Sequence, residues 1–243
     1  MNQNQSCHLS SLRIRGNLLR LSKLFWQSAD RSVAVAIALV EAMFVWESLH
    51  SHAPLVGPRI FGLAFAILLA VLIFRAEKRE TTPPDADGLI GLCLVFFAPS
   101  LYKPNEFVID NDIVTTIYVL SVVFYFSIAL WGYLALKSSI AILPGNRPII
   151  NSGPYRMLRH PIYSAFFHIS ACNLAFSPSI RNLLAMALFG VGIFLRARNE
   201  ERILVGAVSY QELQVQVPAR FSTVFFSLPA AITIALLGFL QFS

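Results

Sequence analysis

Long apolar runs separated by short polar stretches make up most of the chain, and they set the expected architecture. Six or seven such runs can be recognised, and each is about long enough to cross or enter the ~30 Å hydrocarbon core of a bilayer. They cover about residues 32–49, 60–74, 88–102, 113–136, 162–176, 183–195 and 221–242. The pattern predicts an all-α, polytopic membrane protein with about seven transmembrane helices. The two short runs, the fifth and sixth, fit a helical hairpin equally well.

Composition agrees with a membrane location. Of the 243 residues, 56% are hydrophobic and 13% are charged, and the mean hydropathy is +0.63. Soluble domains carry about a quarter charged residues, so this chain is hard to reconcile with a water-facing surface. The net charge of +6 fits cytoplasmic lysines and arginines better than a nucleic-acid partner. Cys7, Cys93 and Cys172 are scattered, and neither a disulfide nor a metal site is expected.

Basic residues are concentrated at one end of the predicted helices. Sixteen of the 19 lysines and arginines fall in the N-terminal stretch or in the loops after the second, fourth and sixth runs. The three on the other side are Arg59, Lys103 and Arg181. By the positive-inside rule, the side with the basic excess is cytoplasmic. The distribution predicts seven crossings, a cytoplasmic N-terminus and a C-terminus on the opposite side.

A basic stretch precedes the apolar runs. The sequence "SLRIRGNLLRLSKLFWQ" (11–27) mixes Leu, Ile and Phe with four basic residues and has no uninterrupted apolar core. It is therefore not typical of a secretory signal. Its spacing favours an amphipathic helix at the membrane surface, and a disordered basic tail is the alternative.

The first polar cluster, "GPYRMLRHPIY" (153–163), stands at the beginning of the fifth run. Pro161 suits the first turn of a helix, where its missing N–H is not needed. His160 then occupies the cap position, beside unpaired backbone N–H groups that can bind an anion. Tyr163 falls on the first turn, and Tyr155 lies on the preceding loop. The cluster fits either a polar pocket with aromatic walls or an interfacial belt of Tyr and Arg anchors.

The second polar cluster, "RARNEERIL" (196–204), follows the sixth run. Arg196 and Glu200 are four residues apart, so they share one face of a helix. Glu200 and Glu201 lie within about two helical turns of the hydrocarbon, and charges held so close to lipid usually face a cavity and have a function. A solvated, charged helix end is the alternative.

Two further polar residues lie inside apolar runs. Glu41 fits a proton relay, a contact between protomers or a hydrogen bond between helices, of which the last is favoured. His168 fits a polar group satisfied within the core better than a ligand. No P-loop, GxGxxG, HExxH or GxSxG motif is present.

Together the two clusters resemble the isoprenylcysteine carboxyl methyltransferase (ICMT) family, which is grouped with the phospholipid methyltransferases among integral-membrane methyltransferases. The similar stretch begins at "LKSSIAILPGNRPII" (136–150), continues through "GPYRMLRHPIY" and resumes at "RARNEERIL". A weaker similarity follows at "SYQELQVQVPARF" (209–221), where Leu213 replaces a frequent aromatic residue. The pairing of GPYxxxRHPxY with a downstream RxxxEExxL makes the resemblance specific.

The resemblance implies that S-adenosylmethionine is the cofactor, bound on the cytosolic side beneath loops and helix ends. It implies catalytic roles for Arg196, Glu200 and Arg159, with Arg196 facing the substrate. A carboxylate suits the cofactor's ammonium or sulfonium, and an arginine fork suits an acidic acceptor. Arg159 and Glu201 either contact a ligand or hold a neighbour in place. The residues that it assigns to the cofactor pocket are Arg147, Pro148, Ile149, Ile150, Tyr155, His160, Pro161, Ile162, Tyr163, Glu200 and Glu201.

The expected reaction is methyl transfer from the sulfonium to oxygen or nitrogen of a lipophilic acceptor that approaches laterally from the lipid. A carboxylate acceptor needs no general base, so the enzyme's task is positioning and desolvation. Isoprenylcysteine-type carboxylates, lipid amines and related small molecules are the candidate acceptors. The expected partners are the bilayer and this acceptor, without nucleic acid or metal. The alternatives are a membrane transporter or channel, a non-catalytic membrane scaffold and a nicotinamide-dependent membrane reductase.

These elements divide the chain into four parts. A basic amphipathic segment (1–31) precedes transmembrane helices one to four (32–136). An ICMT-like catalytic region with two short membrane helices (137–220) follows, and a transmembrane helix (221–243) ends the sequence.

Overall fold

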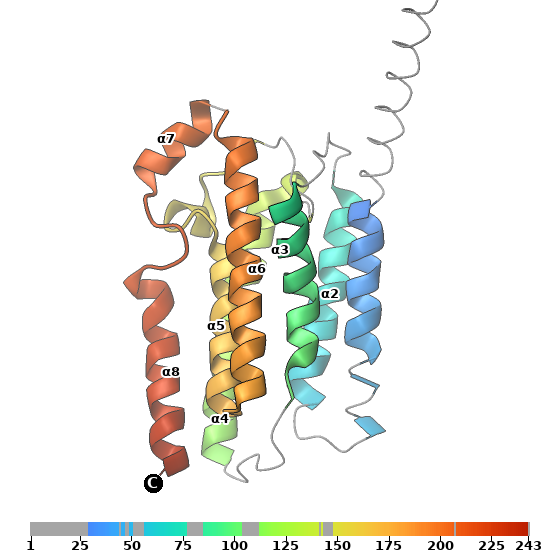
Figure 1. Ribbon diagram of the computed structural model, residues 1–243, viewed down its shortest axis with the longest axis vertical. Coiled ribbons are helices and arrows are strands. Elements are labelled where there is room, and N and C mark those ends of the chain that lie inside the picture. The colour runs from blue at the N-terminus through green and yellow to red at the C-terminus, as the bar shows by residue number, and fades with distance from the viewer. Residues whose placement is uncertain are drawn as a thin grey trace, which may run out of the picture.

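The structure is a computed structural model whose regular elements are all helical within the residues that it describes (Figure 1). The predicted all-α fold is therefore confirmed. The predicted surface helix at 11–27 lies outside the described residues. Those residues are 29–43, 45–46, 49–50, 56–76, 85–103, 112–140, 142, 148–206 and 208–242.

Apart from α6, which is longer, and α7, which no apolar run predicts, the helices coincide with the predicted apolar runs to within a few residues. Residues 29–43 form a helix without a label, drawn blue in Figure 1 and called the first helix below. The short 3-10 turns are η1 (Ala98–Leu101), η2 (Lys137–Ser139) and η3 (Gly153–Arg156). The labelled α-helices are α2 (Val56–Arg75), α3 (Ala86–Phe97), α4 (Asp112–Leu136), α5 (Pro161–Phe176), α6 (Ile180–Leu204), α7 (Val208–Gln216) and α8 (Val224–Phe242).

Helix starts follow local capping chemistry. The Asp85 side chain accepts a hydrogen bond from Gly88 N at 2.7 Å and so caps α3. The Ser179 side chain caps α6 in the same way. Helix α5 begins at Pro161 with His160 in the cap position, as the sequence predicts.

Helix α6 is longer than the apolar run from which it was predicted. The run ends at Leu195, but the helix continues without a break to Leu204. Residues 196–204 are mostly good helix formers, and i, i+4 contacts such as Arg196–Glu200 support them. At about 1.5 Å per residue, the 25 residues reach about 37 Å. The second polar cluster is thereby carried on the end of a rigid helix.

Among the described residues, α4 and α6 are the two helices long and apolar enough to cross a membrane by length and composition. Three shorter apolar helices lie at Gly62–Arg75, Ala86–Leu101 and Phe226–Leu240. The predicted number of about seven crossings stays a prediction.

Close packing of α3 against α6 fixes the part of α6 that precedes the second polar cluster. A Cβ added at Gly192 would lie 2.8 Å from Leu94 Cβ, and one added at Gly91 would lie 2.9 Å from Arg196 N. Small residues allow membrane helices to approach so closely. Helix α4 packs along α5, and α8 contacts both of them (Figure 1).

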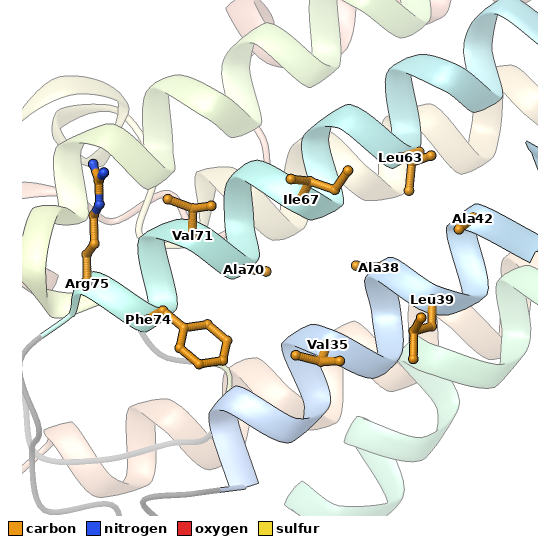
Figure 2. Close-up of a pocket in the computed structure, with 10 residues that line it drawn as sticks. All are labelled: Val35, Ala38, Leu39, Ala42, Leu63, Ile67, Ala70, Val71, Phe74 and Arg75. Atoms are coloured by element: carbon orange, nitrogen blue, oxygen red, sulfur yellow. The ribbon is translucent and has the colours of Figure 1, made fainter.

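The first helix packs on α2, and an apolar groove of about 500 Å³ lies between them (Figure 2). Its wall residues include Leu39 and Ile67, which are 61% and 50% exposed. Arg75 stands at one end of the groove. Such exposed apolar side chains are typical of a surface that faces lipid.

Candidate active site

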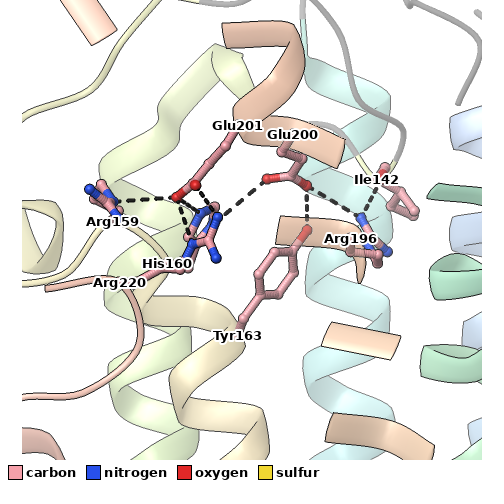
Figure 3. A network of polar contacts seen from close by, with 8 residues as sticks. All are labelled: Ile142, Arg159, His160, Tyr163, Arg196, Glu200, Glu201 and Arg220. Carbon is pink, nitrogen blue, oxygen red and sulfur yellow. Dashed lines mark hydrogen bonds and ion pairs between the residues drawn. The ribbon is translucent and has the colours of Figure 1, made fainter. Parts of the chain in front are cut away.

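The two polar clusters meet where the C-terminal end of α6 lies against the N-terminal end of α5 (Figure 3). The site is at the same end of the bundle as α7 (Figure 1). His160, Arg196, Glu200 and Glu201 are each less than 10% exposed. Charged side chains are buried to this extent when they are paired, so the contacts among them define the site.

The Glu201 carboxylate is surrounded by basic groups. Arg220 donates from Nε to Glu201 Oε1 at 3.0 Å, and its Nη2 makes a second bond to Oε2. His160 donates from Nε2 to Oε1 at 3.0 Å. Arg159 Nε lies 3.3 Å from the same oxygen. This Glu201 cluster joins α6 to the loop before α5 and to the segment after α7.

The Glu200 carboxylate faces a different set of side chains. The Tyr163 hydroxyl donates a hydrogen bond to Glu200 Oε1. Arg196 Nη2 lies 3.7 Å from Oε1, and His160 Nδ1 lies 4.0 Å from Oε2. The two nitrogens of His160 therefore face the two neighbouring acids.

Arg196 is held on several sides. Its Nη2 donates a hydrogen bond to the backbone carbonyl of Ile142. Its guanidinium lies over the Tyr163 ring, 5.4 Å from the centroid. With Glu200 one helical turn away, the guanidinium has a defined orientation inside the site. Arg196 and Glu200 therefore share one helical face and one polar site, as predicted.

Backbone hydrogen bonds set the loop that precedes α5. Arg159 N donates to Ala219 O and His160 N donates to Arg220 O, each at 3.1 Å. At its other end, Gly153 has φ +59° and lies against Trp131, so a side chain there would be strained and crowded. The loop is thus fixed at both ends.

Electrostatic effects follow from this geometry. The hydrogen bond to Glu201 raises the pKa of Arg220 above its ordinary value. Burial, followed by the negative charge of Glu201, raises the pKa of Tyr210 on α7. Both side chains therefore keep their protons at neutral pH, and Arg220 stays a cation beside Glu201.

The predicted lining residues are distributed around the two clusters. Ile162 is buried, and Ile150 and Tyr155 pack against the same apolar core. Ile149 packs against α7 and the end of α6, Pro161 is buried, and Pro148 is exposed. Arg147 lies outside the described residues. The assignment of these residues to a cofactor pocket stays a prediction.

Three participants were not predicted from the sequence. Arg220 lies in the stretch "SYQELQVQVPARF", whose weak family similarity was the one available signal. Asp30 accepts a hydrogen bond from Ile142 N at 3.0 Å. In the sequence, it stands next to Arg31 at the start of an apolar run, where a charged residue is typical of an ordinary helix end. Ile142 acts through its backbone, which no side-chain pattern reveals.

The model of the isoprenylcysteine carboxyl methyltransferase (ICMT) family matches residues 113–206. This region contains both motifs and the site residues from Ile142 to Glu201, whereas Arg220 lies beyond it, so the resemblance predicted from the motifs is confirmed over this part of the chain. The match indicates an enzyme that transfers methyl groups and an integral membrane protein. No curated protein and no solved structure matched the chain.

Proposed function

We propose that the chain transfers the methyl group of S-adenosylmethionine to a lipophilic acceptor at the cytoplasmic face of the membrane. One observation carries the proposal: adjacent buried acids, Glu200 and Glu201, are held at the end of a membrane helix within the region that matches the ICMT family. Neighbouring acids of this kind suit a ligand that carries positive charge.

The residues present fit the amino-acid end of S-adenosylmethionine. Within the described residues, the buried atoms Arg159 Nε and Tyr210 Oη make no hydrogen bond of good geometry. Both groups interact electrostatically with Glu201. A buried donor that lacks a well-formed hydrogen bond is costly, so both groups favour a ligand that brings a further acceptor, such as a carboxylate. Glu200 offers the matching acceptor for an ammonium.

When bound, the cofactor supplies an electrophilic methyl group on a sulfonium. Glu200 would hold the cofactor's ammonium, and the methyl group would pass from the sulfonium to an oxygen or nitrogen of the acceptor, which would leave a neutral thioether. Arg196 orients the acceptor where that acceptor is an acid, because its planar fork matches a carboxylate. Tyr163 and His160 hold Glu200 and the helix ends in place while burial excludes water.

The cytoplasmic location and the crossing number belong to the proposal. The excess of basic residues on alternate loops supports a cytoplasmic site. The C-terminal end of α8 lies at the end of the bundle opposite to the site (Figure 1), which supports an opposite location for the C-terminus.

Binding and transfer are measured with the full chain purified in detergent. We expect saturable binding of S-adenosylmethionine, lost in Glu200→Ala and His160→Ala and kept in Glu212→Gln, whose side chain is exposed on α7. Labelled methyl transfer to total lipid extract then identifies the acceptor class. Folded wild-type protein that binds no S-adenosylmethionine contradicts the proposal.

A further inference from the structure

Asp30 lies at the start of the first helix, outside the region that matches the ICMT family. Asp30 is only 9% exposed. Burial of an acid at a helix start is costly unless hydrogen bonds compensate it. The Asp30 carboxylate accepts a hydrogen bond from Ile142 N at 3.0 Å, over a separation of 112 residues.

Ile142 links this acid to the polar site. Ile142 is 7% exposed, and its carbonyl accepts the hydrogen bond from Arg196 Nη2. The N–H and the carbonyl of one residue are thus both fixed, one by Asp30 and the other by Arg196. Anchoring the N–H restricts rotation of Ile142 and holds its carbonyl in the direction of the guanidinium.

The orientation of Arg196 depends on these contacts. Figure 3 shows the guanidinium between the Ile142 carbonyl and the Glu200 carboxylate. The Tyr163 ring lies against a further side. Loss of the Ile142 contact removes the support on the side of the first helix and α2. A misplacement of about 1 Å in a positioning group can cost about a hundredfold in rate.

We propose that Asp30 is a positioning residue for Arg196, the arginine that orients the acceptor, and that it acts through the Ile142 backbone. The first helix then contributes to the site even though it lies outside the family match. This inference rests on the proposed function, since Arg196 must orient the acceptor. The proposal predicts that Asp30 affects how the enzyme binds the acceptor and does not affect binding of S-adenosylmethionine.

The first test separates the two ligands. Asp30→Ala removes the acceptor oxygen, whereas Asp30→Asn keeps an oxygen at the same place. We expect Asp30→Ala to raise the KM for the acceptor about tenfold with the Kd for S-adenosylmethionine unchanged, and Asp30→Asn to stay within about threefold of wild type. Asp112→Ala, an exposed acid at the start of α4, is the matched control. If Asp30→Ala does not fold, Asp30→Leu replaces it.

The second test asks whether Asp30 acts through Arg196. In an Arg196→Lys background, Asp30→Ala should add less than twofold to the KM for the acceptor, because coupled residues are not additive. The changes in thermal midpoint among the wild type, Asp30→Ala, Arg196→Lys and the double variant should also be non-additive. Measuring them does not require catalysis.

Two outcomes are thereby kept apart. In an active enzyme, the role of Asp30 is overturned if the effects of Asp30→Ala and Arg196→Lys on the KM and on the thermal midpoint are additive. It is also overturned if Asp30→Ala and Asp112→Ala have equal KM values. Absence of methyl transfer by the wild type contradicts the proposed function. In that case, additive changes in the thermal midpoint still overturn the link between Asp30 and Arg196.

Discussion

The Tyr163 hydroxyl on α5 donates a hydrogen bond to the Glu200 carboxylate on α6. The two residues are 37 positions apart and belong to different motifs. Their contact joins the cluster at the start of α5 to the cluster at the end of α6. A tyrosine that satisfies a buried acid also fixes which way its carboxylate points, and this is the acid proposed to face the cofactor's positive charge.

Tyr163→Phe should weaken binding of S-adenosylmethionine while the protein stays folded. A hydrogen bond to a charged group contributes about 1.5–3 kcal/mol, which corresponds to at least about a tenfold rise in Kd. Titration of the detergent-solubilised protein measures it. Tyr118→Phe is the control, because its hydroxyl on α4 donates to Asn173 on α5, away from the Glu200 carboxylate. Equal Kd values for the two variants would show that Glu200 is oriented without Tyr163.

Glu201→Gln should lower stability more than it lowers ligand binding per folded molecule. The substitution leaves Arg159, His160 and Arg220 without their common anion. Breaking a fully buried pair costs about 3–5 kcal/mol. Because Arg220 is 28% exposed and is partly solvated, we expect about 2 kcal/mol.

Unfolding of the purified protein by denaturant measures this loss. Glu212→Gln changes an exposed acid on α7 and should leave the free energy of unfolding within about 0.5 kcal/mol of the wild type. A Glu201→Gln protein as stable as the control contradicts a structural role for the Glu201 cluster.

The sequence predicted those features of the site that depend on local patterns. Pro161 sets the start of α5, and this places His160 at the cap and Tyr163 on the first turn. The spacing of Arg196 and Glu200 places both on one face of α6. The apolar runs located α4 and α6, which are long enough to cross a bilayer, and the shorter apolar helices.

The remaining features depend on contacts between distant segments. Arg220 reaches Glu201 only because the chain turns back after α7, and α7 itself has no apolar run to predict it. Asp30 and Ile142 are 112 residues apart. The apolar run ends at Leu195, but α6 continues to Leu204 on local propensity and packing, which agrees with the predicted helical pairing of Arg196 with Glu200.

Gly192→Val should separate α3 from α6 and disturb the site. A Cβ there would lie 2.8 Å from Leu94 Cβ and 2.9 Å from Val95 N, and backbone cannot move aside cheaply. Overpacking of this kind costs about 1–3 kcal/mol or more. The matched control is Gly238→Val on α8, where an added Cβ meets nothing within 4 Å. The thermal midpoint should fall for Gly192→Val alone; equal midpoints contradict the close α3–α6 packing.

Asp85 makes the stability of the α3 start depend on pH. The backbone hydrogen bond from Gly88, together with the pair to Arg202 at 2.8 Å, holds the pKa of Asp85 below its ordinary value of 3.8. A lowered folded-state pKa means that the ionised form is favoured by folding. Its contribution is therefore fully present above about pH 4 and is lost as the pH falls through the folded-state pKa.

Two substitutions separate the cap of α3 from the charge at Asp85. Asp85→Asn keeps a capping oxygen but loses the charge, so its stability should lie below that of the wild type at pH 7 and approach it below pH 4. Asp85→Ala also loses the cap and should be about 1 kcal/mol less stable than Asp85→Asn at both pH values. Thermal unfolding at pH 7 and pH 3 measures both differences. A gap between wild type and Asp85→Asn that does not narrow on acidification shows that the Asp85 charge does not stabilise the helix start.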